Sequence, residues 1–204
     1  MTLESYARFL WEAEIVQVRT APPWFRWASG KESPVYVDHR RLLSYPRWRA
    51  WVVQALESRL RGAPSFRSVV GVATGGIPWA AWLSAHLGLP MGYVRPEPKG
   101  HGLGRQVEGL PAPIGPVLLI EDLLSTGGSL HKAAQALEAG GFPIAAAVVL
   151  WSYDVPGPLP FGFPLYALLT FPQAVAFWEK AGWLSSEART FLLNWHRAGF
   201  QLYL

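Results

Sequence analysis

Hydrophobic positions along the 204-residue chain follow two kinds of spacing. Short apolar runs typical of buried strands occur at 68–72, 91–95, 117–120, 144–150 and 165–170. Apolar residues at helical spacing occupy four longer segments, at 3–16, 45–60, 172–180 and 185–198. Two more helices are expected to follow glycine-bearing turns and to run to Leu87 and Leu137. Because strands and helices alternate over residues 67–151, we predict an α/β fold with a parallel sheet flanked by helices.

The segment 25–38 has a pattern of its own, in which two short strands surround a Ser29-Gly30 turn. We predict that a small N-terminal hood is built mainly from about residues 20–40, and that the C-terminal helices within 172–198 pack on it. Half of the residues are hydrophobic, so the chain is long enough for one sizeable core. The whole chain, 1–204, is therefore predicted to be a single domain.

Composition narrows the classes of function. The net charge is +4, and the basic residues are mostly arginines scattered along the chain, which suits anionic small molecules at least as well as nucleic acid. The absence of cysteine excludes disulfides, thiolate metal sites and a cysteine nucleophile. The N-terminal stretch carries acids where a signal peptide would be basic and then apolar, and no apolar run approaches membrane-spanning length. We expect a cytoplasmic protein with no nucleic-acid partner and no membrane partner.

The stretch 117–130, VLLIEDLLSTGGSL, carries the strongest chemical signal. A buried strand leads to Glu121-Asp122, the only adjacent acidic pair in the sequence, and then to a turn of serine, threonine and glycine before a helix. Glycine backbone N–H groups, hydroxyls and a helix N-terminus together bind phosphate. Carboxylates accept hydrogen bonds from sugar hydroxyls or help to hold Mg²⁺. The pattern predicts a phosphorylated-sugar site; the alternative is a capped helix preceded by two solvated acids.

Two other segments fit an anionic ligand. Thr74-Gly75-Gly76 follows the strand at 68–72 and opens a helix, which makes a second anion-ready helix start. The glycine-rich segment 96–109 places Lys99 and His101 between glycines, where a mobile lid would bring two cations onto a diphosphate. By composition alone, the same segment is also an ordinary surface loop.

The stretch 117–130 resembles the phosphoribosyl-diphosphate (PRPP) binding motif of the type I phosphoribosyltransferases. The resemblance implies that fold, with the two acids on the ribose hydroxyls and the loop around the 5′-phosphate. Matched to this sequence, the implied PRPP-binding residues are Thr74, Gly75, Arg95, Lys99, His101, Glu121, Asp122, Leu123, Leu124, Ser125, Thr126, Gly127, Gly128 and Ser129.

Two further motifs resemble those of the orotate phosphoribosyltransferases. The first is Phe25-x-x-x-Ser29-Gly30-x-x-Ser33-Pro34, and the second is the Tyr-Val-Arg-x-x-x-Lys-Gly-His-Gly run at 93–102. The family's activity converts orotate and PRPP to orotidine 5′-monophosphate and diphosphate in pyrimidine synthesis. The resemblance implies a homodimer with shared active sites and a Mg²⁺ ion held mainly by PRPP, near Glu121 and Asp122. It also implies catalytic roles for Lys99, His101 and Asp122, and orotate-binding roles for Tyr36, Val37 and Ser125.

Three positions depart from the better-known bacterial pattern. Ala28 and Pro96 stand where many members carry lysines, and Val155 stands where many carry the arginine that binds the orotate carboxylate. Arg26, Arg40 and Arg41 are nearby cations that would substitute for that arginine. Two alternatives therefore stay open: a phosphoribosyltransferase for another base, and a non-catalytic, PRPP-sensing, nucleic-acid-binding regulator on the same fold.

Overall fold

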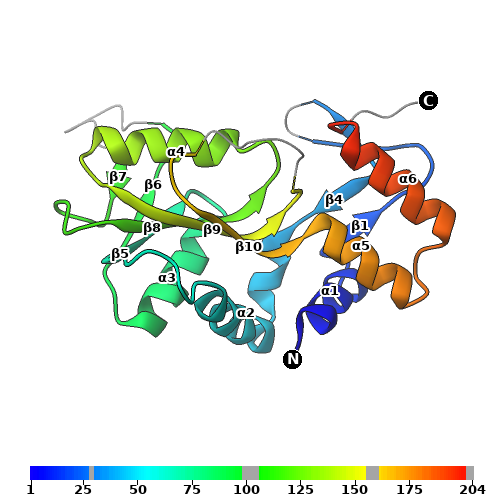
Figure 1. Ribbon diagram of the computed structural model, residues 1–204, viewed down its shortest axis with the longest axis horizontal. Helices are drawn as coiled ribbons and strands as arrows, with labels where there is room; N and C mark the ends of the chain where they lie inside the picture. The colour runs from blue at the N-terminus through cyan, green and yellow to red at the C-terminus, as the bar shows by residue number, and fades with distance from the viewer. Residues whose placement is uncertain (28–29, 98–105, 155–160, 201–204) are drawn as a thin grey trace. The chain divides into compact units, whose positions relative to one another are not determined.

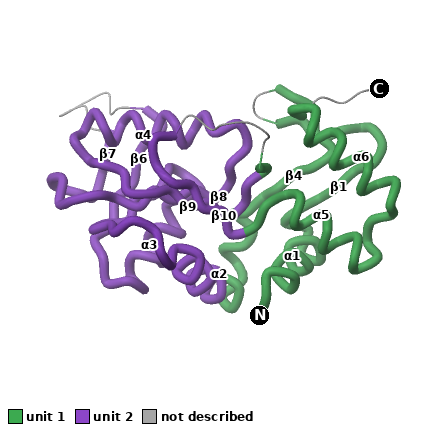
Figure 2. Tube along the Cα trace, viewed as in Figure 1, with its two compact units in different colours: residues 1–48, 153–157, 169–204 green, residues 49–152, 158–168 purple. Residues whose placement is uncertain are grey.

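The computed structural model describes residues 1–27, 30–97, 106–154 and 161–200. The chain divides into two compact units, drawn in different colours in Figure 2. Unit 1 comprises residues 1–48, 153–157 and 169–204, and unit 2 comprises residues 49–152 and 158–168. Helix α2, Pro46–Arg59, contributes residues to both.

A six-stranded sheet, with strand order β10-β9-β8-β5-β6-β7, organises unit 2 (Figure 1). Neighbours β6, β5, β8 and β9 run parallel, and the edge strand β7 is antiparallel to β6. The strands are β5 Ser68–Val72, β6 Met91–Val94, β7 Val107–Glu108, β8 Val117–Leu124, β9 Ile144–Ser152 and β10 Leu165–Thr170. The predicted α/β class with a parallel sheet is confirmed.

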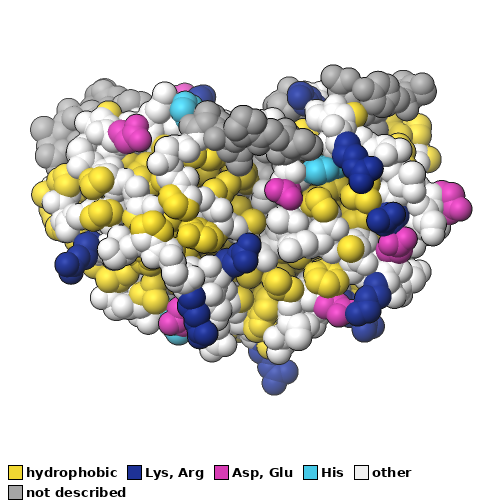
Figure 3. Space-filling model, in the orientation of Figure 1, with side chains coloured by type: hydrophobic (Ala, Val, Ile, Leu, Met, Phe, Trp, Pro, Cys, Tyr) yellow, Lys and Arg dark blue, Asp and Glu magenta, His cyan; other side chains and the backbone are white. Residues whose placement is uncertain are grey.

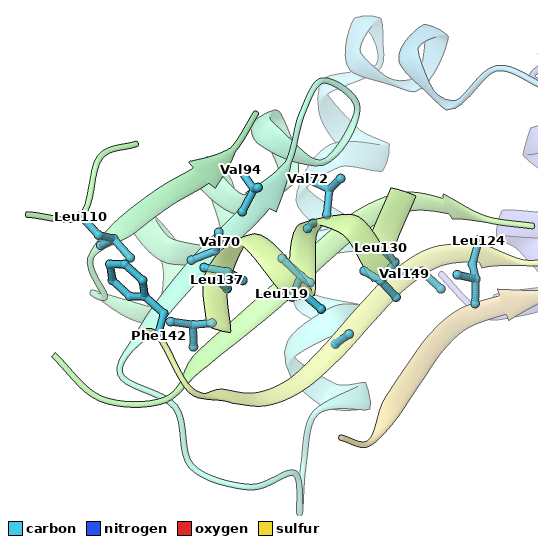
Figure 4. Close-up of a cluster of buried hydrophobic side chains, with 14 residues drawn as sticks. Val70, Val72, Val94, Leu110, Leu119, Leu124, Leu130, Leu137, Phe142 and Val149 are labelled. Carbon is cyan, nitrogen blue, oxygen red and sulfur yellow. The ribbon is translucent and has the colours of Figure 1, made fainter. Parts of the chain in front are cut away.

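Helices cover both faces of this sheet. Helix α4, Gly128–Ala139, lies on one face, and α3, Gly76–Leu87, lies on the other (Figure 1). Alternate strand residues point to opposite faces, and those facing α4 meet its buried leucines in one apolar cluster (Figure 4). The cluster includes Val70, Val72, Leu119, Val149, Leu130 and Leu137. This packing holds α4 against β5, β8 and β9.

Unit 1 contains short strands and helices. Strands β1, Val16–Val18, and β4, Val35–Val37, pair antiparallel, as do β2, Phe25–Arg26, and β3, Glu32–Ser33. The helices of this unit are α1 Leu3–Glu12, the 3-10 helix η1 His39–Ser44, α5 Phe171–Lys180 and α6 Ser186–Arg197. Trp24 of the predicted hood stacks on Phe191 of α6, with ring centroids 5.6 Å apart.

Three of the boundaries that differ from prediction are explained by strand pairing. The helix expected over 3–16 ends at Glu12, because the β-branched residues of β1 pair with β4. The strand expected at 117–120 continues to Leu124, since it stays paired with β9 as far as Ser152. The loop expected over 96–109 is shorter at its carboxyl end, where Val107 and Glu108 pair with β6.

Candidate active site

The carboxyl ends of β5 and β8 lie side by side, because these parallel neighbours pair with Gly71 opposite Ile120. Each strand leads into a glycine-bearing turn and then a helix, α3 after β5 and α4 after β8. Ligands of parallel α/β sheets bind at this edge. The register therefore brings together the two anion-ready turns that the sequence predicts.

Close backbone packing joins the first turn to β8. A β-carbon on Gly75 would overlap the Asp122 carboxyl group, and one on Gly76 would overlap the Ile120 carbonyl oxygen. Thr74, at the tip of this turn, is exposed and follows a cis peptide bond from Ala73. A side chain at Gly76 would push the turn away from the β8 backbone, and one at Gly75 would displace either the turn or the Asp122 carboxylate.

The second turn leads into α4 without a side-chain cap. Gly127, in the left-handed region at φ 81°, is the N-cap of α4. Among the described residues, no side chain caps the first N–H groups of α3 or α4, whereas Thr2, Thr170 and Ser185 cap α1, α5 and α6. Uncapped N–H groups and the positive end of the helix dipole suit a phosphate.

The remaining residues of the predicted phosphate loop differ in exposure. Thr126, Gly128 and Ser129 are exposed and Ser125 is half-buried. Leu123 and Leu124 belong to β8 rather than to the turn, and the Leu124 side chain lies in the apolar cluster. Their main chain, rather than their side chains, is what they offer to a ligand.

The two adjacent carboxylates point to opposite faces of β8, as successive strand residues do. Asp122 lies against Gly75 at the start of α3, and Glu121 accepts a 2.5 Å hydrogen bond from the Ser129 hydroxyl of α4. Glu121 is only 7% exposed, and its second oxygen, Oε2, has no hydrogen-bond partner among the described residues. Each carboxylate therefore contacts the start of a different helix.

Burial makes Glu121 a weak acid. It raises the pKa of this carboxyl from 4.5 to about 7; the hydrogen bond from Ser129 opposes the rise, and the charge of Asp122 adds to it. A buried carboxyl with a free lone pair stays available to accept or donate a hydrogen bond at a sugar hydroxyl.

This raised pKa predicts a stability gain for the variant Glu121→Gln. The folded protein holds the proton more tightly than the unfolded chain, so this group favours folding fully below pH 4.5 and loses that contribution as the pH rises to 7. The loss corresponds to about 3 kcal/mol. In urea unfolding, Glu121→Gln should be more stable than the parent at pH 8 and equal to it at pH 4. Glu138→Gln, an exposed neutralisation on α4, is the control; equal gains in both variants would contradict the assignment.

Arg95 lies just beyond β6, at the stem of the predicted lid. Its backbone N–H donates to the Gln106 carbonyl at 2.9 Å, and its guanidinium lies 3.6 Å from the Glu108 carboxylate. The Gln106 amide in turn donates to the carbonyls of Arg95 and Pro96, at 2.8 and 3.2 Å. The two ends of the segment are thereby joined. Lys99 and His101 themselves lie outside the described residues, as do Ala28 and Val155.

Of the three predicted orotate-binding residues, Tyr36 and Val37 belong to unit 1, and Ser125 belongs to unit 2. Tyr36 and Val37 lie in β4 and are half-buried. The Tyr36 ring stacks on Phe25 of β2, with centroids 5.7 Å apart and planes 30° apart. Tyr36 and Phe25 thus form a stacked aromatic pair in unit 1.

The sequence did not indicate two residues that pack against the turns before α3 and α4. Gly71, inside β5, allows the backbone of Gly76 to approach, since a β-carbon there would lie 2.9 Å from Gly76 backbone atoms. A glycine inside an apolar strand is a recognised signal of such an approach. Phe161 lies against Gly127, whose added β-carbon would be 3.1 Å from the ring, and no local pattern indicates this contact.

Comparisons with known proteins agree with this geometry. A family model for the phosphoribosyl transferase domain matches residues 38–158. An orotate phosphoribosyltransferase of Lactiplantibacillus plantarum is 38% identical over 178 residues, covering 85% of this chain and 84% of that protein. One of Cutibacterium acnes is 40% identical over 197 residues, covering 93% and 90%.

The similarity extends to solved structures. The crystal structure of orotate phosphoribosyltransferase from Aeropyrum pernix matches with a TM-score of 0.74 at 34% identity, and the match covers 88% of this chain and 99% of that one. Sequence and fold therefore agree over most of the chain. The chain belongs to the orotate phosphoribosyltransferases of the type I phosphoribosyltransferase family.

Proposed function

We propose that the protein transfers the phosphoribosyl group of PRPP to orotate, forming orotidine 5′-monophosphate and diphosphate in pyrimidine synthesis. The observation that carries this function is the pair of uncapped helix starts beside Glu121 and Asp122, in a chain about 40% identical to orotate phosphoribosyltransferases. One helix start serves the 5′-phosphate and the other serves the diphosphate.

The ribose and 5′-phosphate are assigned to β8 and the start of α4. Ser125 to Ser129 hold the phosphate through hydroxyls and backbone N–H groups, with main-chain support from Leu123 and Leu124. Glu121 and Asp122 accept hydrogen bonds from the ribose hydroxyls. These contacts orient the anomeric carbon toward the base. Because the two reactants are held in a fixed relative orientation, much of the entropic barrier is removed.

The leaving diphosphate is assigned to the other helix start and to the lid. Thr74 and Gly75 offer donors from the turn before α3, and Arg95, Lys99 and His101 supply positive charge. The reaction breaks the anomeric C–O bond with oxocarbenium character and forms the bond to the pyrimidine nitrogen. Catalysis then consists mainly of stabilising the departing negative charge and excluding water.

A Mg²⁺ ion fits this site as a partner of the substrate. Within the described ranges, no three His, Cys, Asp or Glu side chains are placed to hold a metal ion. We propose an ion bound mostly by PRPP oxygens, with Asp122 or Glu121 nearby, because Mg²⁺ prefers phosphate oxygens and few carboxylates. When bound, Mg²⁺ supplies charge neutralisation of the diphosphate.

We assign the orotate ring to Tyr36 and Val37, with Ser125. We also propose a homodimer with shared active sites; a single-chain mass in sedimentation at working concentration would contradict it.

On the face drawn in Figure 3, lysine and arginine side chains lie apart from one another, which does not favour a nucleic-acid surface.

The cellular setting is a further proposal. None of the helices in the described part of the chain is long and apolar enough to cross a membrane. We propose that the enzyme works in the cytoplasm; its recovery in the membrane fraction of fractionated cells would contradict this.

The function is tested by identifying the product. The protein incubated with PRPP, Mg²⁺ and orotate should convert orotate to its 5′-phosphoribosyl nucleotide, seen by mass spectrometry. Salt-dependent DNA or RNA binding without any nucleotide formation would instead support a regulator.

A further inference from the structure

The anionic substituent of orotate needs a positive partner. Burying a carboxylate without a cation or several hydrogen bonds is costly. The position after β9 that carries an arginine in many family members is Val155, which is uncharged. The structure around Tyr36 offers a different arginine.

The Arg19 guanidinium lies over the ring of Phe25. The guanidinium carbon lies 4.0 Å from the centroid of the Phe25 ring, and that ring stacks on Tyr36. Gln17 lies directly opposite Tyr36 in the β1–β4 pair, and the Arg19 N–H continues this pairing by donating to the Pro34 carbonyl at 2.8 Å. Cross-strand partners share a face, so Gln17 and Tyr36 project to the same side. Arg19 is two residues after Gln17, and residues two apart in a strand also share a face, so the side chains of Arg19 and Tyr36 project to the same side.

The orientation of this guanidinium is fixed, yet most of its donors remain. One N–H group of the guanidinium donates to the Pro23 carbonyl at 2.5 Å, and the guanidinium carbon lies over the Phe25 ring. Arginine carries five N–H donors in a fork that matches a carboxylate. The Arg19 side chain pairs with no carboxylate among the described residues, and it is exposed.

The other arginines near Tyr36 are placed differently. Arg40 donates to the Asp38 carboxylate at 2.9 Å, and Arg41 donates to the Glu14 carbonyl at 2.8 Å. Arg26 pairs across from Glu32 and, as the neighbour of Phe25 in β2, projects from the opposite face of that strand.

We propose that Arg19 binds the carboxylate of the pyrimidine substrate, while Phe25 and Tyr36 provide the aromatic surface beside it. Arg19 is thus a specificity-determining residue, because it favours a pyrimidine that carries a carboxylate over one that does not. This inference rests on the proposed function and adds a residue that lies outside the three sequence motifs.

The test compares orotidine 5′-monophosphate with uridine 5′-monophosphate, which lacks the carboxylate. In Arg19→Gln, the Kd of orotidine 5′-monophosphate and the KM of orotate should rise about 10- to 100-fold, the range for a charge-assisted hydrogen-bonded pair. The Kd of uridine 5′-monophosphate and the KM of PRPP should stay within about twofold, as neither ligand offers the carboxylate. Arg19→Lys should recover part of the preference.

Arg61→Gln is the control, since it removes the same charge from an exposed position in unit 2 and should leave both Kd values as in the parent. Equal weakening of the two nucleotides in Arg19→Gln would indicate a structural role and overturn the proposal, as would no weakening of either. If the parent protein fails to convert orotate, the proposed function fails; if it converts orotate and Arg19→Gln keeps its preference, only the role of Arg19 fails.

Discussion

Replacing Lys99 with alanine is expected to lower kcat about 10²- to 10³-fold, the effect of removing one preorganised charge from a developing anion. The reason is the diphosphate leaving group, which carries more negative charge on its bridging oxygen in the transition state than in the ground state. A positioned ammonium acts mainly on that difference, so kcat falls more than KM rises.

The measurement for Lys99→Ala is steady-state diphosphate release at saturating orotate and PRPP, with the melting temperature recorded alongside. Lys180→Ala is the control, because this exposed lysine pairs with Glu4 in unit 1 and is no part of the proposed chemistry. A kcat in Lys99→Ala close to that of the control would remove the lid lysine from the mechanism.

Gly75→Ala is the second large effect, and it tests the described geometry directly. The added methyl group would overlap the Asp122 carboxyl group, so either that carboxylate or the turn before α3 must move. Displacements of about 1 Å in such a site cost about 10²-fold in rate. We expect kcat/KM for PRPP to fall by about that factor.

Gly162→Ala provides a matched substitution in the same unit, because an added β-carbon there meets no atom within 4 Å and the backbone is not left-handed. It should leave kcat/KM for PRPP unchanged. If Gly75→Ala retained full activity, the contact between this turn and Asp122 would have no part in catalysis.

Much of the fold follows from local pattern. Apolar runs such as Val117–Ile120 are too short and too continuous for surface helices, and they indicate buried parallel strands. The start of α6 follows equally directly, since Ser185 accepts a hydrogen bond from the Ala188 N–H as an N-cap does. Such features depend on neighbours in the sequence.

Other features depend on distant partners and could not be predicted. Strand β1 forms because Val16 and Val18 pair with β4. In the sequence alone, the same residues continue the helical spacing of the preceding segment. Glu121 and Asp122 point to opposite faces because β8 extends past them, and this extension depends on pairing with β9. The sequence indicates that two carboxylates are adjacent, but only the paired strand turns them to different helices.

The position of Arg19 shows the same limit. It follows β1 in a segment without any motif, and its contact with Phe25 arises because two separate strand pairs bring these residues together. A resemblance based on contiguous motifs predicts roles for Tyr36 and the acids, and it gives no role to an arginine that follows a neighbouring strand.

The most direct test of the proposed function is the substrate preference of the purified protein. With PRPP and Mg²⁺ held saturating, diphosphate release is measured with orotate, uracil and adenine. We predict turnover with orotate, and a kcat/KM for uracil and adenine lower by at least about 10²-fold, because a site built for a charged group rejects ligands that leave it unpaired. Equal turnover of uracil or adenine, or no turnover of orotate, would contradict the assignment.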